Sequence, residues 1–445
     1  MRLLPLLTLL LLVACGGHSP HNNKLLTELP PEGVAEKCAA TAEPGLGEHW
    51  VNSWMTAPTD AQISRPLAGQ TERQFIAPHW DGDVVRLRLQ NRYGATAVTL
   101  SNVQLAKQDV GANVIEGSNC QLSFAGSDSV TIQPGESVAS DPIHFDVNAF
   151  EKIAVDFYVP GTIDQPSRHL DAREIPYTST PGDFSGQADG SPFLPSEFNL
   201  ANNWLLLEGL DVVAPSNVGV VVAVGDSITD GATSFFDTFG ADNMPEGTNL
   251  DQRYPDYLAR RLLAANRPLS VANAGIGGNE LTGAGLAPQY GEALLLRYPK
   301  DVLAVPGVTD VVIMIGTNDF GNDASTTAEE VINGYNQLVS DLQAHGLNVI
   351  AGTIPPAAGF PVGQLPAGIG VLHGSSTAAA NRAAVNEWIR TSGVPDGVVD
   401  FKACLEDPDN PGVMLPAYDS GDRLHPNPAG YEAMAACIDL ALFSR

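Results

Sequence analysis

Short apolar runs alternate with amphipathic stretches after Pro215, and this alternation most constrains what the chain can fold into. Residues 218–224 are almost continuously apolar, as expected for a parallel strand that is covered on both faces. Residues 253–265 follow with helical spacing, and residues 269–273 form a second strand-like run. Strands that alternate with helices predict an α/β fold, with a parallel sheet between two layers of helices.

The same alternation continues to the C-terminus. Thr326 and Glu329 have the spacing of a helical capping box, and Gly346 stands where a glycine would end that helix. Asn427 would cap a last helix that begins near Pro428. The other predicted elements are strands at residues 310–315, 347–354 and 398–401 and a helix at residues 378–390. Ligand sites in such sheets lie beyond the carboxyl ends of the strands.

In the first half of the chain, apolar side chains recur with a different period. Val85, Leu87 and Leu89 alternate with polar side chains, as in a strand with one buried face. Further strand-like runs lie at residues 97–105, 129–132, 153–159 and 204–213. No long helical pattern interrupts them, so we predict an antiparallel β-sandwich of the jelly-roll type. The predicted domains are this β-sandwich at residues 44–213 and the α/β domain at residues 214–445.

Residues 1–14 have the features of a secretory signal peptide. Arg2 precedes an apolar stretch at residues 3–13, which is shorter than the ~20 residues that a membrane-spanning helix needs. The following Leu-Val-Ala-Cys sequence resembles the lipobox of bacterial lipoproteins, which implies cleavage before Cys15 and acylation of that residue. Several acyl chains would anchor the protein stably. Residues 15–43, rich in Gly, Pro, Asn and Glu, are predicted to be a tether.

The lipobox resemblance implies an exported bacterial lipoprotein that faces the periplasm or the cell exterior. Gly16, directly after the lipidated cysteine, fits sorting to the outer membrane if the host is Gram-negative. An ordinary signal peptide with an incidental cysteine is the alternative. No other stretch of the sequence is apolar and long enough to cross a bilayer.

Acidic residues outnumber basic ones by 51 to 23, and the formal net charge is −28. Such an excess repels phosphate backbones, so we expect no nucleic-acid partner. The acidic residues are scattered along the chain, which is typical of a solvated surface.

Four cysteines remain once Cys15 is set aside, namely Cys38, Cys120, Cys404 and Cys437. In an exported chain they predict two disulfides, with three possible pairings. Proximity in the sequence favours Cys38 with Cys120 and Cys404 with Cys437. Neither Cys-x-x-Cys nor His-x-x-x-His spacing occurs, which argues against a zinc site.

Loops after the first two predicted strands of the α/β domain contain a serine and a run of glycines. Ser227 lies in the Gly-Asp-Ser-Ile-Thr-Asp-Gly turn, which would expose its hydroxyl as a nucleophile if a base takes the proton. A helix N-cap is the alternative for this serine. Gly278 lies in a glycine-rich loop at residues 273–279, which would point backbone N–H groups at an anion. A plain tight turn is the alternative there, and no Gly-Lys-Ser/Thr follows to support phosphate binding.

Two later loops add an amide, a carboxylate and an imidazole. Asn318 offers an amide donor suited to an oxyanion, and an Asx turn is the alternative. Asp422 lies three residues before His425, where its carboxylate could fix the imidazole tautomer. A structural histidine is the alternative. Each motif is weak alone, but the four together, in this order and at one sheet edge, are specific.

The order Ser, Gly, Asn, Asp-x-x-His resembles the SGNH hydrolases, also called the GDSL esterase/lipase family, over about half the chain. The resemblance implies a flavodoxin-like α/β fold. It also implies that Ser227 is the nucleophile, that His425 is the general acid/base and that Asp422 orients His425. The oxyanion hole would consist of the N–H groups of Ser227 and Gly278 and the side-chain amide of Asn318.

The sequence departs from the family pattern in three places. Ile228 stands where the family name implies leucine, and both are apolar. Residues 232–251 are longer than a minimal family loop, and would form a lid, an acyl-site wall or a surface excursion without consequence. The glycine-rich residues 359–376 would border the site.

Residues 50–58 and 85–94 resemble the β-sandwich that precedes the catalytic domain in secreted two-domain SGNH esterases. Relatives with that layout are often described as acetyl- or aryl-esterases that act on carbohydrate esters. Trp50, Trp54 and Trp80 would either stack on sugars or belong to the core, and we favour the core.

The predicted function is therefore a lipid-anchored serine esterase for short-chain, acetyl- or aryl-type esters of carbohydrates or small molecules. This mechanism needs no metal or organic cofactor. One alternative is a lipase or phospholipase, which a missing amphipathic hydrophobic segment near the site disfavours. The other is a carbohydrate-binding surface lipoprotein with an inert hydrolase domain, although a binding protein has no need of all five motif residues.

Overall fold

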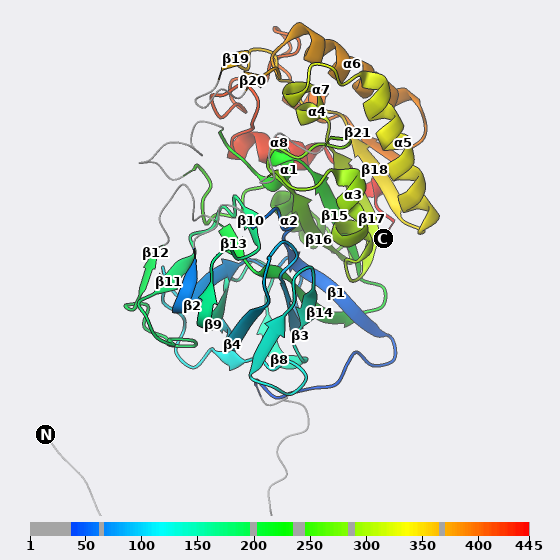
Figure 1. The fold of residues 1–445 in the computed structure, drawn as a ribbon. Coiled ribbons are helices and arrows are strands. Elements are labelled where there is room, and N and C mark those ends of the chain that lie inside the picture. Colours follow the sequence, from blue (N-terminus) through cyan, green and yellow to red (C-terminus); the bar gives the residue numbers. More distant parts are fainter. Residues whose placement is uncertain are drawn as a thin grey trace, which may run out of the picture. The chain divides into compact units, whose positions relative to one another are not determined.

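The computed structural model describes residues 37–61, 66–195, 203–234, 245–283, 290–364 and 370–444. Residues 37–445 form one compact unit, shown in Figure 1 as a ribbon. The predicted signal peptide, the predicted lipidation site Cys15 and residues 16–36 of the predicted tether lie outside the described residues. Within the described ranges, no helix combines the length and apolarity that crossing a membrane requires.

The second half contains a parallel sheet of five strands. Their spatial order is β16–β15–β17–β18–β21, which is 2-1-3-4-5 in chain order and therefore flavodoxin-like, as predicted. The strands are β15 (Gly219–Gly225), β16 (Leu269–Gly275), β17 (Val308–Met314), β18 (Asn348–Gly352) and β21 (Gly397–Val399).

Helices cover both faces of this sheet (Figure 1). Consecutive side chains of a strand point to opposite faces. On β15, Val222 belongs to the same apolar cluster as side chains of α5 and α6, whereas Val221 belongs to a second cluster with α2 and α8. These helices are α2 (Tyr254–Ala264), α5 (Ala328–Ala344), α6 (Ser376–Thr391) and α8 (Pro428–Cys437). The shorter helices are α1 (Ser227–Asp230), α3 (Leu294–Tyr298), α4 (Thr317–Asn322) and α7 (Phe401–Leu405).

The ends of two helices test the predicted caps. Asn427 caps α8 as expected, since its side chain accepts from the Gly430 N–H at 2.9 Å. The capping box of α5 was predicted one residue too early, because Thr327 and Glu330 form it. Both Thr-Glu pairs have the same spacing, so the spacing alone does not distinguish them.

The first half consists mainly of two antiparallel sheets. Eight of their strands are ordered β1–β14–β3–β8 in one sheet and β2–β9–β4–β6 in the other. The chain crosses between the sheets at each step from β1 to β4, which agrees with the predicted jelly roll. These strands are β1 (Glu48–Met55), β2 (Leu67–Ile76), β3 (Gly82–Gln90), β4 (Val98–Lys107), β6 (Ser129–Ile132), β8 (Ile143–Val147), β9 (Ile153–Ile163) and β14 (Leu207–Pro215).

Short strands extend these sheets or form separate pairs. They are β5 (Cys120–Gln121), β7 (Ser137–Ala139), β10 (Arg168–Leu170), β11 (Tyr177–Ser179), β12 (Phe193–Pro195), β13 (Asn203–Leu205), β19 (Gly363–Gln364) and β20 (Gly370–Val371). The predicted strand at residues 204–213 is thus divided between β13 and β14, because Leu206 has a positive φ of 60°.

The tryptophans of this half belong to its packing. Trp54 is buried and makes an edge-to-face contact with Trp204, with ring centroids 4.9 Å apart. The guanidinium of Arg86 covers the ring of Trp50 at 4.4 Å from the centroid. Trp80 is half-buried and packs against the core.

Both disulfides join the cysteines that are neighbours in the sequence. Cys38 is bonded to Cys120 near one edge of the β-sandwich, and Cys404 of α7 is bonded to Cys437 of α8. The favoured pairing is therefore the one found in the structure.

Candidate active site

Ser227 is the first residue of α1, directly beyond the carboxyl end of β15. The N-cap is Asp226, whose Oδ1 accepts from the Ile228 N–H at 3.0 Å, so the alternative of Ser227 as the cap is wrong. Gly231 ends this single turn in the left-handed conformation, with φ of 102°. The short turn leaves the Ser227 hydroxyl free to bond to groups beyond the sheet edge.

The Ser227 hydroxyl, the His425 ring and the Asp422 carboxylate form a chain of hydrogen bonds. The Ser227 Oγ lies 2.9 Å from His425 Nε2, and His425 Nδ1 lies 2.6 Å from Asp422 Oδ2. The other carboxylate oxygen accepts from the backbone N–H groups of Leu424 and His425, each at 2.8 Å. A carboxylate that accepts from Nδ1–H leaves Nε2 as the acceptor for the serine proton. The three side chains are all buried.

Gly278 lies in the loop directly after the end of β16. Its φ is +74°, and a Cβ there would lie 2.3 Å from the ring of Tyr290, so both the backbone and the space require glycine. Among the described residues the Gly278 N–H has no acceptor, and neither has the N–H of Ser227 at the first position of α1. These two groups are therefore available to an anion.

Asn318 lies in α4, after the end of β17. Its Nδ2 donates to the Asn279 carbonyl at 2.9 Å, which uses one of the two amide hydrogens. The adjacent Asp319 accepts from the N–H groups of Leu281 and Thr282 and from the Thr282 hydroxyl. Asp319 therefore connects α4 to the segment directly after the glycine-rich loop.

Arg297 of α3 holds the ends of two strands together. Its guanidinium donates to the carbonyls of Gly225 at 3.0 Å and Ala274 at 2.9 Å and to the side chain of Asn279 at 3.0 Å. Asp301 pairs with it at 3.1 Å. The loops that contain Ser227 and Gly278 thus leave the sheet from strand ends bonded to one buried side chain.

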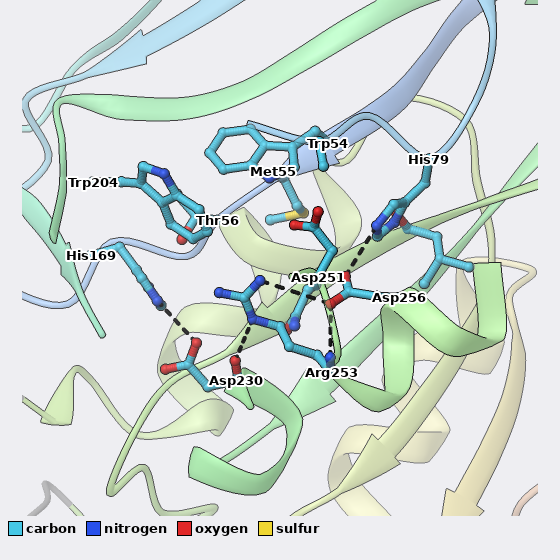
Figure 2. A pocket seen from close by; sticks show the side chains of 13 residues that line it. Trp54, Met55, Thr56, His79, His169, Trp204, Asp230, Asp251, Arg253 and Asp256 are labelled. Carbon is cyan, nitrogen blue, oxygen red and sulfur yellow. Dashed lines mark hydrogen bonds and ion pairs between the residues drawn. The ribbon is translucent and has the colours of Figure 1, made fainter. Parts of the chain in front are cut away.

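The β-sandwich reaches the same loops through His169 of β10 (Figure 2). His169 Nε2 lies 3.0 Å from Asp230 Oδ1, and the other oxygen of Asp230 accepts from the Gly277 N–H at 3.0 Å. The His169 Nδ1 donates to the Ala57 carbonyl at 2.7 Å. Asp230 therefore connects α1, the glycine loop and the β-sandwich.

A second histidine of the β-sandwich makes a matching connection (Figure 2). His79 Nε2 lies 3.1 Å from Asp256 of α2, and its Nδ1 bonds to the Val271 carbonyl at 2.8 Å. Between the two histidines, a cavity of about 20 Å³ is lined by Trp204 and Arg253, among other residues. That volume has room for about one water molecule.

The two long stretches that the sequence analysis placed near the site are described in part. Of residues 232–251, residues 235–244 lie outside the described residues, so the lid or acyl-site wall stays a prediction. The end at residues 245–251 is bonded to the β-sandwich, since Asn249 donates to the Arg173 carbonyl and accepts from the Ile175 N–H. From the other long stretch, His373 contacts Asn318, as expected for a segment that borders the site.

Sequence reasoning brought together the five motif residues but missed the side chains that support them. Asp319 is adjacent to Asn318 and could have been noticed as part of the same motif. Arg297 and His169 had no local signal, because their partners are backbone carbonyls and a distant aspartate.

Asp226, directly before Ser227, is an acid with a raised pKa. Its side chain is fully buried, and Oδ2 has no hydrogen-bond partner among the described residues. Burial disfavours the carboxylate and raises the pKa of Asp226 to about 7. The N–H of Ile228 and the nearby His425 lower the pKa again, but by less than burial raises it.

A model of the GDSL-like lipase/acylhydrolase family matches residues 223–433, which include all five motif residues. No curated protein matches the chain. A lipase/acylhydrolase from Enterococcus faecalis is 22% identical, with 49% of this chain and 93% of that chain covered and a TM-score of 0.36. A carbohydrate acetylesterase from Sinorhizobium meliloti is 17% identical, with 49% and 94% covered and a TM-score of 0.36. An acetylxylan esterase from Geobacillus stearothermophilus is 23% identical, with 50% and 94% covered and a TM-score of 0.34.

The raised pKa of Asp226 predicts a specific dependence of stability on pH. Between pH 4 and 7 the unfolded chain releases this proton while the folded chain retains it, so the free energy of unfolding falls as pH rises. Asp226→Asn keeps an N-cap oxygen and removes the titration. From pH 4 to pH 7, the free energy of unfolding of the wild type should fall by a few kcal/mol relative to that of this variant, as measured by urea denaturation.

Comparing the two proteins at each pH cancels the other groups that titrate in the same range. Parallel stability curves for the wild type and Asp226→Asn from pH 4 to 7 would contradict the prediction.

Proposed function

Since residues 223–433 form a GDSL-like lipase/acylhydrolase domain, we propose that this protein is a serine esterase that hydrolyses short-chain carboxylic esters. One observation carries the proposal. The Ser227 hydroxyl lies 2.9 Å from His425 Nε2, and Asp422 lies 2.6 Å behind the same ring. This is the arrangement of nucleophile, base and orienting carboxylate that acyl transfer requires.

In the first step, Ser227 Oγ attacks the ester carbonyl while His425 Nε2 takes the hydroxyl proton. Asp422 stabilises the imidazolium that forms and holds the ring in its tautomer. The carbonyl oxygen becomes an oxyanion, which the N–H groups of Ser227 and Gly278 and the free amide hydrogen of Asn318 would bind. Removing one such donor typically costs about 10²–10³-fold in kcat.

The tetrahedral intermediate then collapses. His425 gives its proton to the departing alcohol, and an acyl group remains on Ser227. Water attacks that acyl group with His425 again as the base, and the released carboxylic acid restores the free serine.

The proposed substrate is a short acyl ester, of the acetyl or aryl type, on a carbohydrate or another small molecule. The resemblance of the N-terminal half to the β-sandwich of two-domain SGNH esterases supports this choice. The low exposure of Ser227, 8%, is also consistent with a small acyl group.

Ser227→Ala should lower kcat on a short chromogenic acyl ester by about 10⁴–10⁶-fold, because the proposed acyl-enzyme forms on the hydroxyl that this change removes. Ser270→Ala is a matched control. Ser270 is also buried, it lies on the neighbouring strand β16, and its hydroxyl has no partner among the described residues. Circular dichroism and the melting temperature should match the wild type for both variants. Unchanged turnover by Ser227→Ala would remove this residue from the mechanism.

The acyl-chain preference separates an esterase from a lipase. We expect kcat/KM to be highest for acetyl esters of p-nitrophenol, lower for butyryl esters and lowest for palmitoyl esters. A maximum at long chains would instead identify a lipase or phospholipase. Binding on a glycan array without hydrolysis of any ester would support an inert hydrolase domain.

We also propose that the protein is exported as a lipoprotein, with Cys15 as the acylated residue and a bacterial membrane as its location, the outer membrane if the host is Gram-negative. Expression in a bacterial host with an alkynyl palmitate should label the wild type and leave Cys15→Ala unlabelled. Mass spectrometry of the mature N-terminus checks the cleavage site. A mature chain that starts elsewhere, without a lipid, would favour an ordinary signal peptide.

A further inference from the structure

His373 contacts the amide that would bind the oxyanion. It follows β20, and its Nε2 lies 3.0 Å from Asn318 Oδ1. The side chain is 4% exposed, and its ring packs edge-on against Phe360 with centroids 5.2 Å apart. Its backbone carbonyl accepts from Arg382 Nη1 of α6 at 2.7 Å. Asn318 and Phe360 therefore contact the ring, and Arg382 fixes the backbone of the same residue.

The contact determines where the ring hydrogen is. An amide oxygen can only accept, so Nε2 must be the protonated nitrogen. Burial, together with smaller effects of Arg382 and His425, lowers the pKa of His373 to about 3, so the ring is neutral at ordinary pH. Its Nδ1 is buried and has no partner among the described residues, as expected for the unprotonated nitrogen.

The packing around the ring leaves space for this side chain and little else. At Gly321 of α4, a Cβ would lie 2.1 Å from His373 Nε2, so a larger residue there would displace the imidazole. The N–H of the preceding Leu372 donates to the Gly321 carbonyl at 2.8 Å. The segment containing His373 is thereby bonded to the same helix that contains Asn318.

An asparagine amide has two orientations that differ by exchange of its oxygen and nitrogen. In one, Nδ2 faces the Asn279 carbonyl, and Oδ1 faces His373. In the other, the amide oxygen would face the Asn279 carbonyl, and two acceptors would meet without a hydrogen between them. The Asn279 carbonyl therefore selects the orientation, and in that orientation His373 Nε2 donates to Asn318 Oδ1.

We propose that His373 is a positioning residue: its hydrogen bond to Asn318 Oδ1 anchors the amide in the orientation that the Asn279 carbonyl selects, with the nitrogen facing the oxyanion of the hydrolytic reaction. This inference rests on the proposed function. His373 does not touch the substrate in this role and transfers no proton. Its effect is on the transition state, so losing the hydrogen bond should lower kcat and leave KM nearly unchanged.

The test compares His373→Gln with His373→Met. The two new side chains have nearly the same shape and disturb the packing alike, but only glutamine can donate to Asn318 Oδ1. We expect kcat of the Met variant to be at least about 10-fold lower than that of the Gln variant. This effect should be smaller than the loss of kcat, about 10²–10³-fold, that removing a whole donor causes. KM should stay within about twofold of the wild type. The shape of the pH–rate profile should not change, because the ring is neutral throughout.

The same pair in an Asn318→Ala background shows whether His373 acts through Asn318. Without the amide, the Gln and Met variants should have equal kcat, because the interaction energy vanishes when its partner is removed. Equal kcat of the two variants in the wild-type background would overturn the proposal. The proposal would also fail if the kcat difference between the Gln and Met variants were as large in the Asn318→Ala background as in the wild type.

Failure of this inference is distinct from failure of the proposed function. If Ser227→Ala abolishes hydrolysis and the Gln and Met variants are alike, the esterase mechanism stands and only the role of His373 is wrong. If Ser227→Ala retains activity, the proposed mechanism fails first.

Discussion

One buried guanidinium sets the spacing of the loops that meet at the edge of the parallel sheet. Arg297 bonds to the carbonyls at the ends of β15 and β16, and these strands lead into the segments that contain Ser227 and Gly278. A planar group with several fixed donors suits this task, because it holds several acceptors in one geometry. The positive charge is balanced by Asp301, which also pairs with Arg92 of the β-sandwich at 2.6 Å. The alignment of the Ser227 and Gly278 segments therefore depends on a charge network that extends into the first half of the chain.

The β-sandwich accordingly supports the site rather than only preceding it. Arg92, His79 and His169 each reach an aspartate of the second half. Of these, the His169–Asp230 pair reaches the candidate site directly, since Asp230 ends the helix that begins with Ser227 and accepts from the Gly277 N–H. Buried pairs of this kind cost desolvation and are favourable only when every polar group is satisfied, which ties the local geometry to the packing of both halves.

The parts of the site that could be predicted are those with local chemistry in a fixed topological place. Ser227, Gly278, Asn318 and the Asp422–His425 pair lie beyond the ends of parallel strands or in the loop before α8, and the α/β order brings such loops to one edge. The predicted caps show where two neighbouring residues suit the same role. Thr327 with Glu330, rather than the predicted Thr326 with Glu329, caps α5, and Asp226 caps α1, which excludes the alternative of Ser227 as the cap. In each case the exact start of the helix decides, and spacing does not define it to one residue.

By itself, the sequence determined the alternation of strand and helix in the second half, the two-residue hydrophobic period of the first half and the order of the motif residues. These depend on side chains close together in the chain or on rules of chain connection that apply to every such sheet. Only the tertiary structure brought Arg297, Asp319, His169 and His373 to the motif residues or to the segments next to them. Their partners are backbone carbonyls, backbone N–H groups, side-chain amides and the carboxylate of Asp230. Backbone groups occur in nearly every residue, and only packing selects which of them a buried donor or acceptor meets.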